Sequence, residues 1–499
     1  MAFWALVNGP AITAPLFENQ TGDITHAYTG GWEHFVGGGV AVLDCDGDQM
    51  AELYAAGGAS PAVLLRNRST REGLTFKAET PSALALTSVI GAYPLDIDSD
   101  GILDLAVLRV GENLLLKGDG ACGFTPFQGI GFSSSDHWTT AFSATWEGMS
   151  TLPTLAFGNY VDRDDENGPF EACDTSFLYR PKDGKYAAPT PLTPAFCPLS
   201  MLFSDWGRQG RADLRVSNDR HYYVKGGEEQ LWAMEQPARL YTQADGWQRY
   251  MIWGMGIASR DISGDGVPEL FLTSMGDQKM QSLAPAQTGP HYLDATYERG
   301  TTAHRPYLGD DGRPSTGWHV AFGDIENNGL DDIFIAKGNV EQMPTSAMTD
   351  PNNLLIQRAD GRFFEAGGSA GIATTDRSRG AALVDLDLDG LLDLVVINRN
   401  ANLEIYRNVS AGTGHWLEVA LHQDGANSLA VGAWIEVDTG VRILSREITV
   451  GGGHAGGAAG YQHFGLGDVA RVKLRVIWPD GSIGDWVDLT ADQALTINR

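Results

Sequence analysis

Residues 385–397 read DLDLDGLLDLVVI, and this stretch decides the fold. Counted from Asp385, oxygen-bearing side chains occupy positions 1, 3, 5 and 9, and an apolar strand follows. The same skeleton begins at Asp44 (DCDGDQMAELY), Asp96 (DIDSDGILDLAV), Asp261 (DISGDGVPELFL) and Asp324 (DIENNGLDDIFI). Two further segments, from Ser143 and from Asp205, keep the frame but lose most of the acids. A motif that recurs in this way predicts a repeat architecture.

The spacing of the frames predicts the kind of repeat. They begin at residues 44, 96, 143, 205, 261, 324 and 385, so successive starts lie 47 to 63 residues apart. Propeller blades of four antiparallel strands have repeats of about 50 residues. We therefore predict an all-β fold, with a seven-bladed β-propeller in residues 1–410 and a small β domain in residues 411–499. LFENQTGDIT, from Leu16, is similar to the end of the sixth unit and should supply the last blade's outer strand.

The alternating oxygens predict cation sites, because side chains at alternating positions of a tight loop point toward a common centre. Ca²⁺ takes six to eight oxygen ligands at about 2.3–2.6 Å, and the loops of this chain could hold about five structural ions. So many carboxylates without a cation would repel one another. The predicted ligands are Asp44, Asp46, Asp48, Glu52, Asp96, Asp98, Asp100, Asp104, Asp261, Ser263, Asp265, Glu269, Asp324, Glu326, Asn328, Asp332, Asp385, Asp387, Asp389 and Asp393.

The alternative is that these acids only form turns, since Asp and Gly are favoured in any turn. This alternative fits the Asp261 and Asp324 loops better than the other three, because Ser263 and Asn328 replace carboxylates there.

The repeats resemble the FG-GAP/VCBS repeats of integrin α-subunit propellers, and more closely those of the bacterial relatives of cartilage acidic protein. Segments within residues 415–481, among them HWLEVAL, REITVGGGH and VIWPDG, are similar to the ASPIC/UnbV domain that follows such propellers. The resemblance implies Ca²⁺ at the five acidic loops and no metal in the third and fourth repeats. The Asp44 loop has Gln49 where the family has glycine, which predicts a strained turn.

The turns after the second strands should lie on the face opposite the acidic loops, where propellers commonly hold ligands. They carry more polar and basic side chains than turns require, so we expect a small anion or polar ligand at this mouth of the channel. The alternative is that these are ordinary solvated turns. The candidate residues are Arg220, Lys279, His319, Glu341, Arg379 and Arg399.

His319 is expected to point into the channel. With a second histidine it could form a transition-metal site, since imidazole suits Cu, Zn or Fe. The alternative is a hydrogen-bonded structural histidine.

The charge balance excludes some partners. Against 35 Lys+Arg stand 63 Asp+Glu, a net charge of −28, which argues against nucleic acid and anionic membranes because both need a basic footprint. The sequence contains no run of 18 apolar residues, so no membrane span is predicted. The start, Met1 to Phe17, lacks a basic region and shows no evident signal peptide. Loops of this type suit Ca²⁺-rich surroundings, which favours a periplasmic or secreted protein.

The four cysteines form no CxxC pair. Cys173 and Cys197 flank a Pro-rich stretch, and they could bridge it or remain two buried thiols.

The sequence contains no GxSxG elbow, HExxH, P-loop or Rossmann fingerprint, so no catalytic residue is assigned. We predict a calcium-binding propeller that acts as an extracytoplasmic binding or adhesion module for an unknown protein, glycan or small polar or anionic ligand. The alternative is a hydrolase or metal-dependent enzyme with its active site at the channel mouth opposite the acidic loops.

Overall fold

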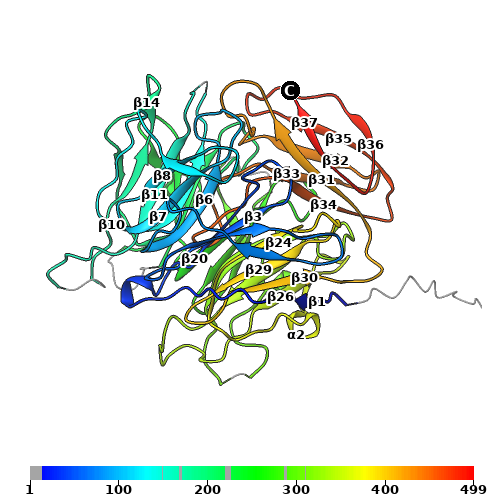
Figure 1. Cartoon of the computed structure of the whole chain (residues 1–499), viewed down its shortest axis with the longest axis horizontal. Helices are drawn as coiled ribbons and strands as arrows, with labels where there is room; N and C mark the ends of the chain where they lie inside the picture. Colours follow the sequence, from blue (N-terminus) through cyan, green and yellow to red (C-terminus); the bar gives the residue numbers. More distant parts are fainter. Residues whose placement is uncertain (1–13, 149, 168–170, 220–225, 286–288, 310) are drawn as a thin grey trace, which may run out of the picture.

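The computed structural model describes residues 14–499 except 149, 168–170, 220–225, 286–288 and 310. Strands dominate this part of the chain (Figure 1). The helical elements in it are α1 (Thr296–Arg299), α2 (Gly367–Ala370) and the 3₁₀ turns Trp32–His34 and Gln243–Asp245. The fold is therefore all-β.

Most strands lie in groups of four antiparallel strands, which we call sheets and number by their order along the chain. A short pairing joins the second and third groups into one eight-stranded sheet. The first three contain β2 (Val40–Leu43), β3 (Glu52–Ala55), β4 (Val63–Asn67), β5 (Phe76–Ala78); β6 (Val89–Leu95), β7 (Asp104–Gly111), β8 (Leu114–Gly118), β9 (Phe124–Pro126); and β10 (His137–Thr145), β11 (Thr154–Asn159), β12 (Ser176–Tyr179), β15 (Thr190–Leu192). The hairpin β13 (Pro181–Lys182) and β14 (Lys185–Tyr186) extends from the third sheet.

The next four sheets repeat the order. They contain β16 (Pro198–Ser204), β17 (Asp213–Asn218), β18 (Gln230–Ala233), β19 (Arg239–Leu240); β20 (Gly254–Arg260), β21 (Glu269–Ser274), β22 (Lys279–Leu283), β23 (Tyr292–Asp294); β24 (Gly317–Gly323), β25 (Asp332–Lys337), β26 (Asn353–Gln357), β27 (Phe363–Glu365); and β28 (Ser378–Val384), β29 (Asp393–Asn398), β30 (Glu404–Asn408) with β1 (Phe17–Asn19). Each acidic loop joins the first strand of a sheet to the second.

The first strands of neighbouring sheets contact one another. The contacts run from β2 through β6, β10, β16, β20, β24 and β28 and return to β2. The N-terminal β1 pairs with β30, with Phe17 opposite Asn408, and completes the seventh sheet. This pairing confirms the prediction that the segment from Leu16 supplies an outer strand.

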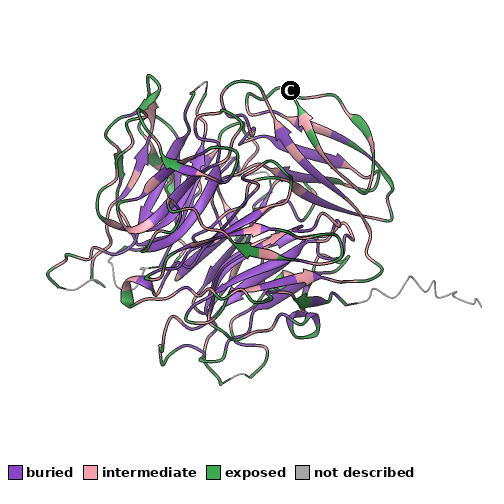
Figure 2. Cartoon of the chain, viewed as in Figure 1, coloured by how far each residue is buried: buried purple, intermediate pink, exposed green. Residues whose placement is uncertain are grey.

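The core includes the first strands of the sheets and the second strands that pair with them. Every residue of β6, VIGAYPL, is buried, and so is every residue of β11, TLAFGN. Continuous apolar runs bounded by turns are typical of strands buried on both faces. Figure 2 shows the buried strands inside and the exposed residues in the connecting loops.

The last strands form two sheets of their own. One contains β31 (His415–His422), β34 (Gln462–Gly467) and β37 (Gln493–Asn498), and the other contains β32 (Trp434–Asp438), β33 (Ile443–Glu447), β35 (Arg471–Ile477) and β36 (Val487–Thr490). They enclose a separate apolar core that includes Leu417, Ile435 and Phe464. We call β31–β37 the C-terminal unit; it lies at the upper right of Figure 1.

Two disulfides cross-link the chain. Cys173 bonds Cys197, which decides between the bridge and the two buried thiols. Cys45 bonds Cys122, 77 residues away, a link between the first two sheets that the sequence did not predict. Disulfides are typical of proteins in oxidising compartments.

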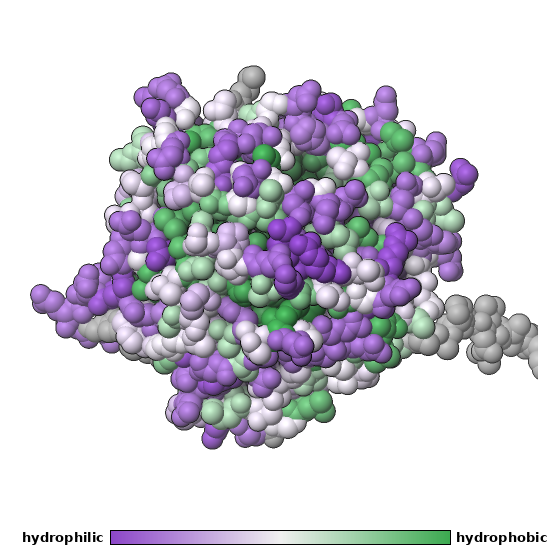
Figure 3. Space-filling view, in the orientation of Figure 1, coloured by the Kyte–Doolittle hydropathy of each residue, from purple (hydrophilic) through white to green (hydrophobic). Residues whose placement is uncertain are grey.

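The face of the molecule in Figure 3 is largely polar, as the charge of the chain leads one to expect. Hydrophilic side chains are spread over the face in view, and hydrophobic ones show in the hollows between them (Figure 3). Among the described residues, no helix has the length and apolar character needed to cross a membrane.

Candidate functional site

The first acid of each loop, after which we name the loop, holds the turn together. In the Asp385 loop, Asp385 Oδ1 accepts from the backbone N of Asp389 at 3.2 Å and Oδ2 from that of Gly390 at 2.7 Å. The acid at position 5, Asp389, accepts from the backbone N of Leu391 at 2.9 Å. The Asp96 and Asp324 loops repeat these bonds. Positions 1 and 5 are therefore explained by the turn itself.

The acid at position 9 ties the loop to its sheet. Asp393 Oδ2 accepts from the backbone N of Leu386 at 3.0 Å, and its Oδ1 accepts from that of Asn408 at 2.8 Å. Asp104 makes the same two bonds in the second sheet. This acid, too, is explained by its hydrogen bonds to the backbone.

The acid at position 3 is different. Asp46, Asp98 and Asp387 accept no hydrogen bond from the described backbone, and Oδ1 of each is buried with no hydrogen-bond partner. The other oxygen of each contacts a basic side chain of the third strand, Arg66, Lys117 or Arg407. A buried carboxylate oxygen without a donor is costly, and turn formation does not explain it.

Three of the five loops gather acids closely. Ligand oxygens lie within 4.8 Å of one another in the groups Asp44, Asp46, Asp48; Asp96, Asp98, Asp104; and Asp385, Asp387, Asp393. Among the described residues, no group of three acids forms in the Asp261 and Asp324 loops. Ser263 and Asn328 replace carboxylates there. These are the two loops for which the sequence favoured the turn-forming alternative most.

Burial makes these acids hard to ionise. Burial, together with neighbouring acids, raises the pKa of Asp104 to about 8 and that of Glu269 to about 7. The pKa values of Asp332 and Asp393 lie well above their usual range for the same reasons. A cation bound among these carboxylates would offset both effects.

The Asp44 loop carries the strain that its sequence predicts. Gln49 has φ 73°, in the left-handed region that favours glycine, and the Asp96 loop has Gly101 in the same place with φ 84°. A non-glycine residue there costs roughly 1 kcal/mol.

A glycine-rich segment of the C-terminal unit, residues 450–459, fills the centre of the ring of first strands. It forms isolated bridges with five of those strands: Val450 with Ala144, Gly451 with Leu202, Gly453 with Ile257, Gly456 with Ala92 and Ala458 with Val42. The sequence showed the run GGGHAGG but gave no sign of where it would lie.

His319 lies buried on its inner strand and contacts this segment. The backbone N of His454 donates to His319 Nδ1 at 3.0 Å, and His454 Nε2 accepts from the backbone N of Gly37 at 3.1 Å. Burial lowers the pKa of His319 to about 4 and that of His454 to about 3, so both rings are neutral. Among the described residues, no group of three metal-binding side chains includes either histidine.

Of the residues predicted for the opposite mouth, Glu341, Arg379 and Arg399 come together. Arg379 is fully buried, lies 4.1 Å from the Trp318 ring centroid, and donates to backbone carbonyls that include Val340 O at 2.6 Å. Arg399 donates to Glu341 at 2.7 Å and to His34 O at 2.7 Å. Their polar groups are thus engaged within the protein.

Of the remaining two predicted residues, the structure describes only Lys279. Lys279 pairs with Asp294 at 2.9 Å on the outer part of the fifth sheet. Arg220 lies outside the described residues.

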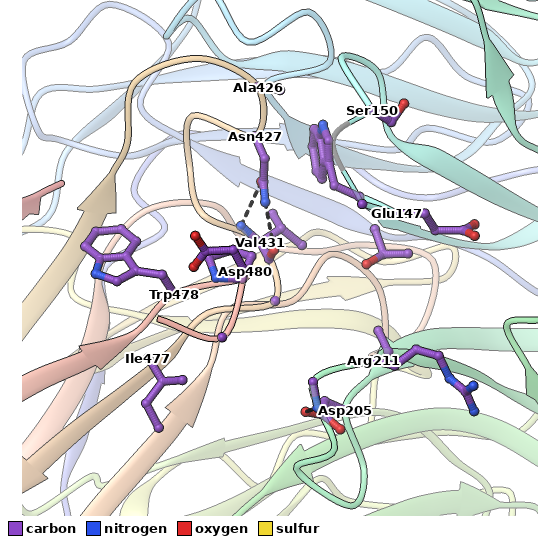
Figure 4. Close-up of a pocket in the computed structure, with 18 of the residues that line it drawn as sticks. Glu147, Ser150, Asp205, Arg211, Ala426, Asn427, Val431, Ile477, Trp478 and Asp480 are labelled. Atoms are coloured by element: carbon purple, nitrogen blue, oxygen red, sulfur yellow. Dashed lines mark hydrogen bonds between the residues drawn. The ribbon is translucent and has the colours of Figure 1, made fainter. Parts of the chain in front are cut away.

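A cleft of about 1250 Å³ lies between the C-terminal unit and the third and fourth sheets (Figure 4). Asp205 and Arg211 line one side, and Asn427, Trp478 and Asp480 line the other. Both acid-poor loops, from Ser143 and from Asp205, contribute to it. Sequence reasoning missed the cleft, because its walls belong to separate parts of the chain.

Most ionic groups of the cleft have protein partners. Arg499 pairs with Asp480 at 2.6 Å and Arg211 with Asp213 at 3.1 Å. Glu447 accepts from Ser204 Oγ at 2.6 Å. The walls therefore offer polar atoms and the rings of Trp146, Trp434 and Trp478 with little unpaired charge.

Comparison with known proteins gives both local and broad similarities. Cartilage acidic protein 1 of Homo sapiens is 28% identical over 160 residues, which cover 32% of this chain and 22% of that protein. The Mus musculus protein is 27% identical over 161 residues, 32% of this chain and 23% of the relative. The chain thus spans less than a quarter of the length of these relatives.

Solved structures are similar at low identity. BBS1N, in its complex with ARL6DN, gives a TM-score of 0.45 at 10% identity over 80% of this chain and 99% of that one. An Agrocybe aegerita lectin that recognises non-reducing terminal N-acetylglucosamine gives 0.38 at 12% identity over 75% and 94%. Residues 423–499 match the family model described as ASPIC and UnbV, so the chain carries an ASPIC/UnbV domain at its C-terminus.

Proposed function

We propose that the chain is a calcium-binding, seven-bladed β-propeller that serves as an extracytoplasmic binding module. The observation that carries the calcium assignment is the buried, unpartnered oxygen of Asp46, Asp98 and Asp387. Three loops bring such an oxygen beside two further carboxylates, and a hard cation is the partner that this donor set suits.

The propeller assignment is supported by the order of strand contacts. Four-stranded sheets follow one another, their first strands touch in a series that returns to β2, and β1 completes the seventh sheet. Radial repetition of such sheets is the arrangement of a β-propeller.

Calcium is favoured over other metals by the ligand type. The loops present carboxylate oxygens, and oxygen ligands suit Ca²⁺. Asp44, Asp96 and Asp385 with their neighbours would hold the ions, with the Asp261 and Asp324 loops as weaker sites. A bound ion would supply the positive charge that the buried acids lack.

The location follows from two features. The disulfides at Cys45 and Cys173 suit an oxidising compartment, and weak Ca²⁺ loops are filled where calcium is plentiful. We infer a periplasmic or secreted protein.

Isothermal titration with Ca²⁺ tests the cation sites. Asp98→Asn and Asp387→Asn should each remove one ion, because the substitution takes away a charged ligand that no turn hydrogen bond requires. The exposed Asp488→Asn should bind as the unchanged chain does. Equal stoichiometry in all of these proteins would refute the assignment.

The cleft is the proposed ligand surface, and its paired charges beside tryptophan rings favour an uncharged glycan. A glycan array should find a binder, and hydrogen exchange of the complex should show protection at residues 147, 148 and 150, and at residues 423–427 and 477–481. Protection around Arg379 and Arg399 instead would move the ligand to the opposite mouth. An array without binders would refute the glycan assignment.

A further inference from the structure

Strand β31 of the C-terminal unit lies directly on the Asp385 loop. A Cβ built on Gly390 would lie 2.0 Å from Trp416 Nε1, so the indole occupies the space that a side chain would need. Asn327 Nδ2 of the neighbouring Asp324 loop donates to Gly390 O at 2.8 Å. Loop and strand are therefore in close contact.

Glu418 follows Trp416 by two residues. It lies on the same face of β31, because side chains alternate along a strand. It is 3% exposed, and its carboxylate accepts no hydrogen bond from the described residues. Its one polar contact given by the structure is His463 Nδ1, 3.5 Å from Oε1.

His463 cannot donate to Glu418. Because the Asn327 amide nitrogen donates to Gly390 O, its Oδ1 faces His463 Nε2 at 2.7 Å and accepts the proton there. His463 Nδ1 then carries a lone pair and has no partner. Among the described residues, Glu418 is thus a buried carboxylate without a hydrogen-bond donor.

Glu418 and Asp385 line the same cavity, of about 620 Å³. Asp387, 2% exposed, keeps its unpartnered Oδ1 in the carboxylate group that it forms with Asp385 and Asp393. Arg260 also lines the cavity, but the carboxylates that stabilise its charge are those of Asp331 and Asp261. The side chains facing this space are therefore rich in oxygen ligands and poor in positive charge.

We propose that Glu418 supplies a carboxylate ligand to the divalent cation of the Asp385 loop, so that one ion joins the seventh sheet to the C-terminal unit. The inference rests on the cation binding proposed above for that loop. The proposed ligand, Glu418, belongs to the C-terminal unit and lies outside the repeat motif of the acidic loops.

Calcium titration of Glu418→Gln in the full chain tests this, because the substitution keeps the shape and removes the charge. We expect one ion to bind at least tenfold more weakly, and calcium-induced protection of residues 415–422 from hydrogen exchange to be lost. The double variant with Asp387→Asn should lose no more binding than Asp387→Asn alone, because both residues serve one ion. The exposed Asp488→Asn, also in the C-terminal unit, is the matched control.

The outcomes separate the two proposals. If Glu418→Gln binds calcium as the unchanged chain does while Asp387→Asn loses one ion, the role of Glu418 is overturned and the loop site stands. If the unchanged chain and Asp387→Asn both bind none, the cation sites themselves fail.

Discussion

Excess EGTA is expected to lower the Tm of this protein by roughly 8 °C or more relative to a calcium-saturated sample. Loops with Kd of about 10⁻⁴–10⁻³ M at about 10 mM Ca²⁺ gain about 1.4–2.7 kcal/mol each. The three loops with gathered acids thus contribute about 4–8 kcal/mol, and a large domain loses about 2 °C for each kcal/mol. The physical source of this gain is the removal of repulsion between buried carboxylates.

Differential scanning calorimetry with calcium, with EGTA and with EGTA followed by excess calcium measures this effect. Recovery of the Tm on calcium addition separates ion loss from damage to the chain. Magnesium should restore less, because it demands octahedral geometry and gives up water reluctantly. A Tm that does not respond to chelator would show that Arg66, Lys117 and Arg407 neutralise the loops by themselves.

Gly91→Ala is expected to displace the glycine-rich segment from the centre of the ring. A Cβ on Gly91 would lie 1.6 Å from the backbone oxygen of Ala455. This clash can be relieved only if the backbone of one or both segments moves. Overpacking of this kind costs about 3 kcal/mol. We expect a lower Tm and new proteolytic cleavage within residues 450–459.

Gly73→Ala is the control, because its nearest neighbour would be Gln20 Oε1 at 3.4 Å, an ordinary contact. If Gly91→Ala melts and resists protease as the unchanged chain does, the segment does not occupy the centre of the ring in solution. Gly39→Ala, where a Cβ would lie 1.8 Å from the same carbonyl, is expected to have the same effect.

Repetition in the sequence made part of this structure predictable. The frames from Asp44 to Asp385 placed the acids of each loop between two strands, and the likeness of the segment from Leu16 to a later outer strand predicted the pairing of β1 with β30. Both predictions depend on local patterns that recur within the chain, so a single sequence is enough to detect them.

The features that sequence reasoning missed depend on contacts between distant segments. Nothing near Glu418 in the chain indicates that it will lie beside Asp385, and Cys45 has no local sign of its partner Cys122. The glycines of residues 450–459 gave no sign of their position, and the structure shows that inner strands such as β6 approach their backbone closely. Tertiary packing decides such contacts.

The place of β1 has a consequence for biosynthesis. Leu16 and Ser410, which bond at the edge of the seventh sheet, are 394 residues apart. A nascent chain emerging from the ribosome must therefore carry an unmatched first strand until almost the whole ring has been translated. Fragments that stop before β30 should leave that strand and the preceding sheets with open edges, which invite aggregation or chaperone capture.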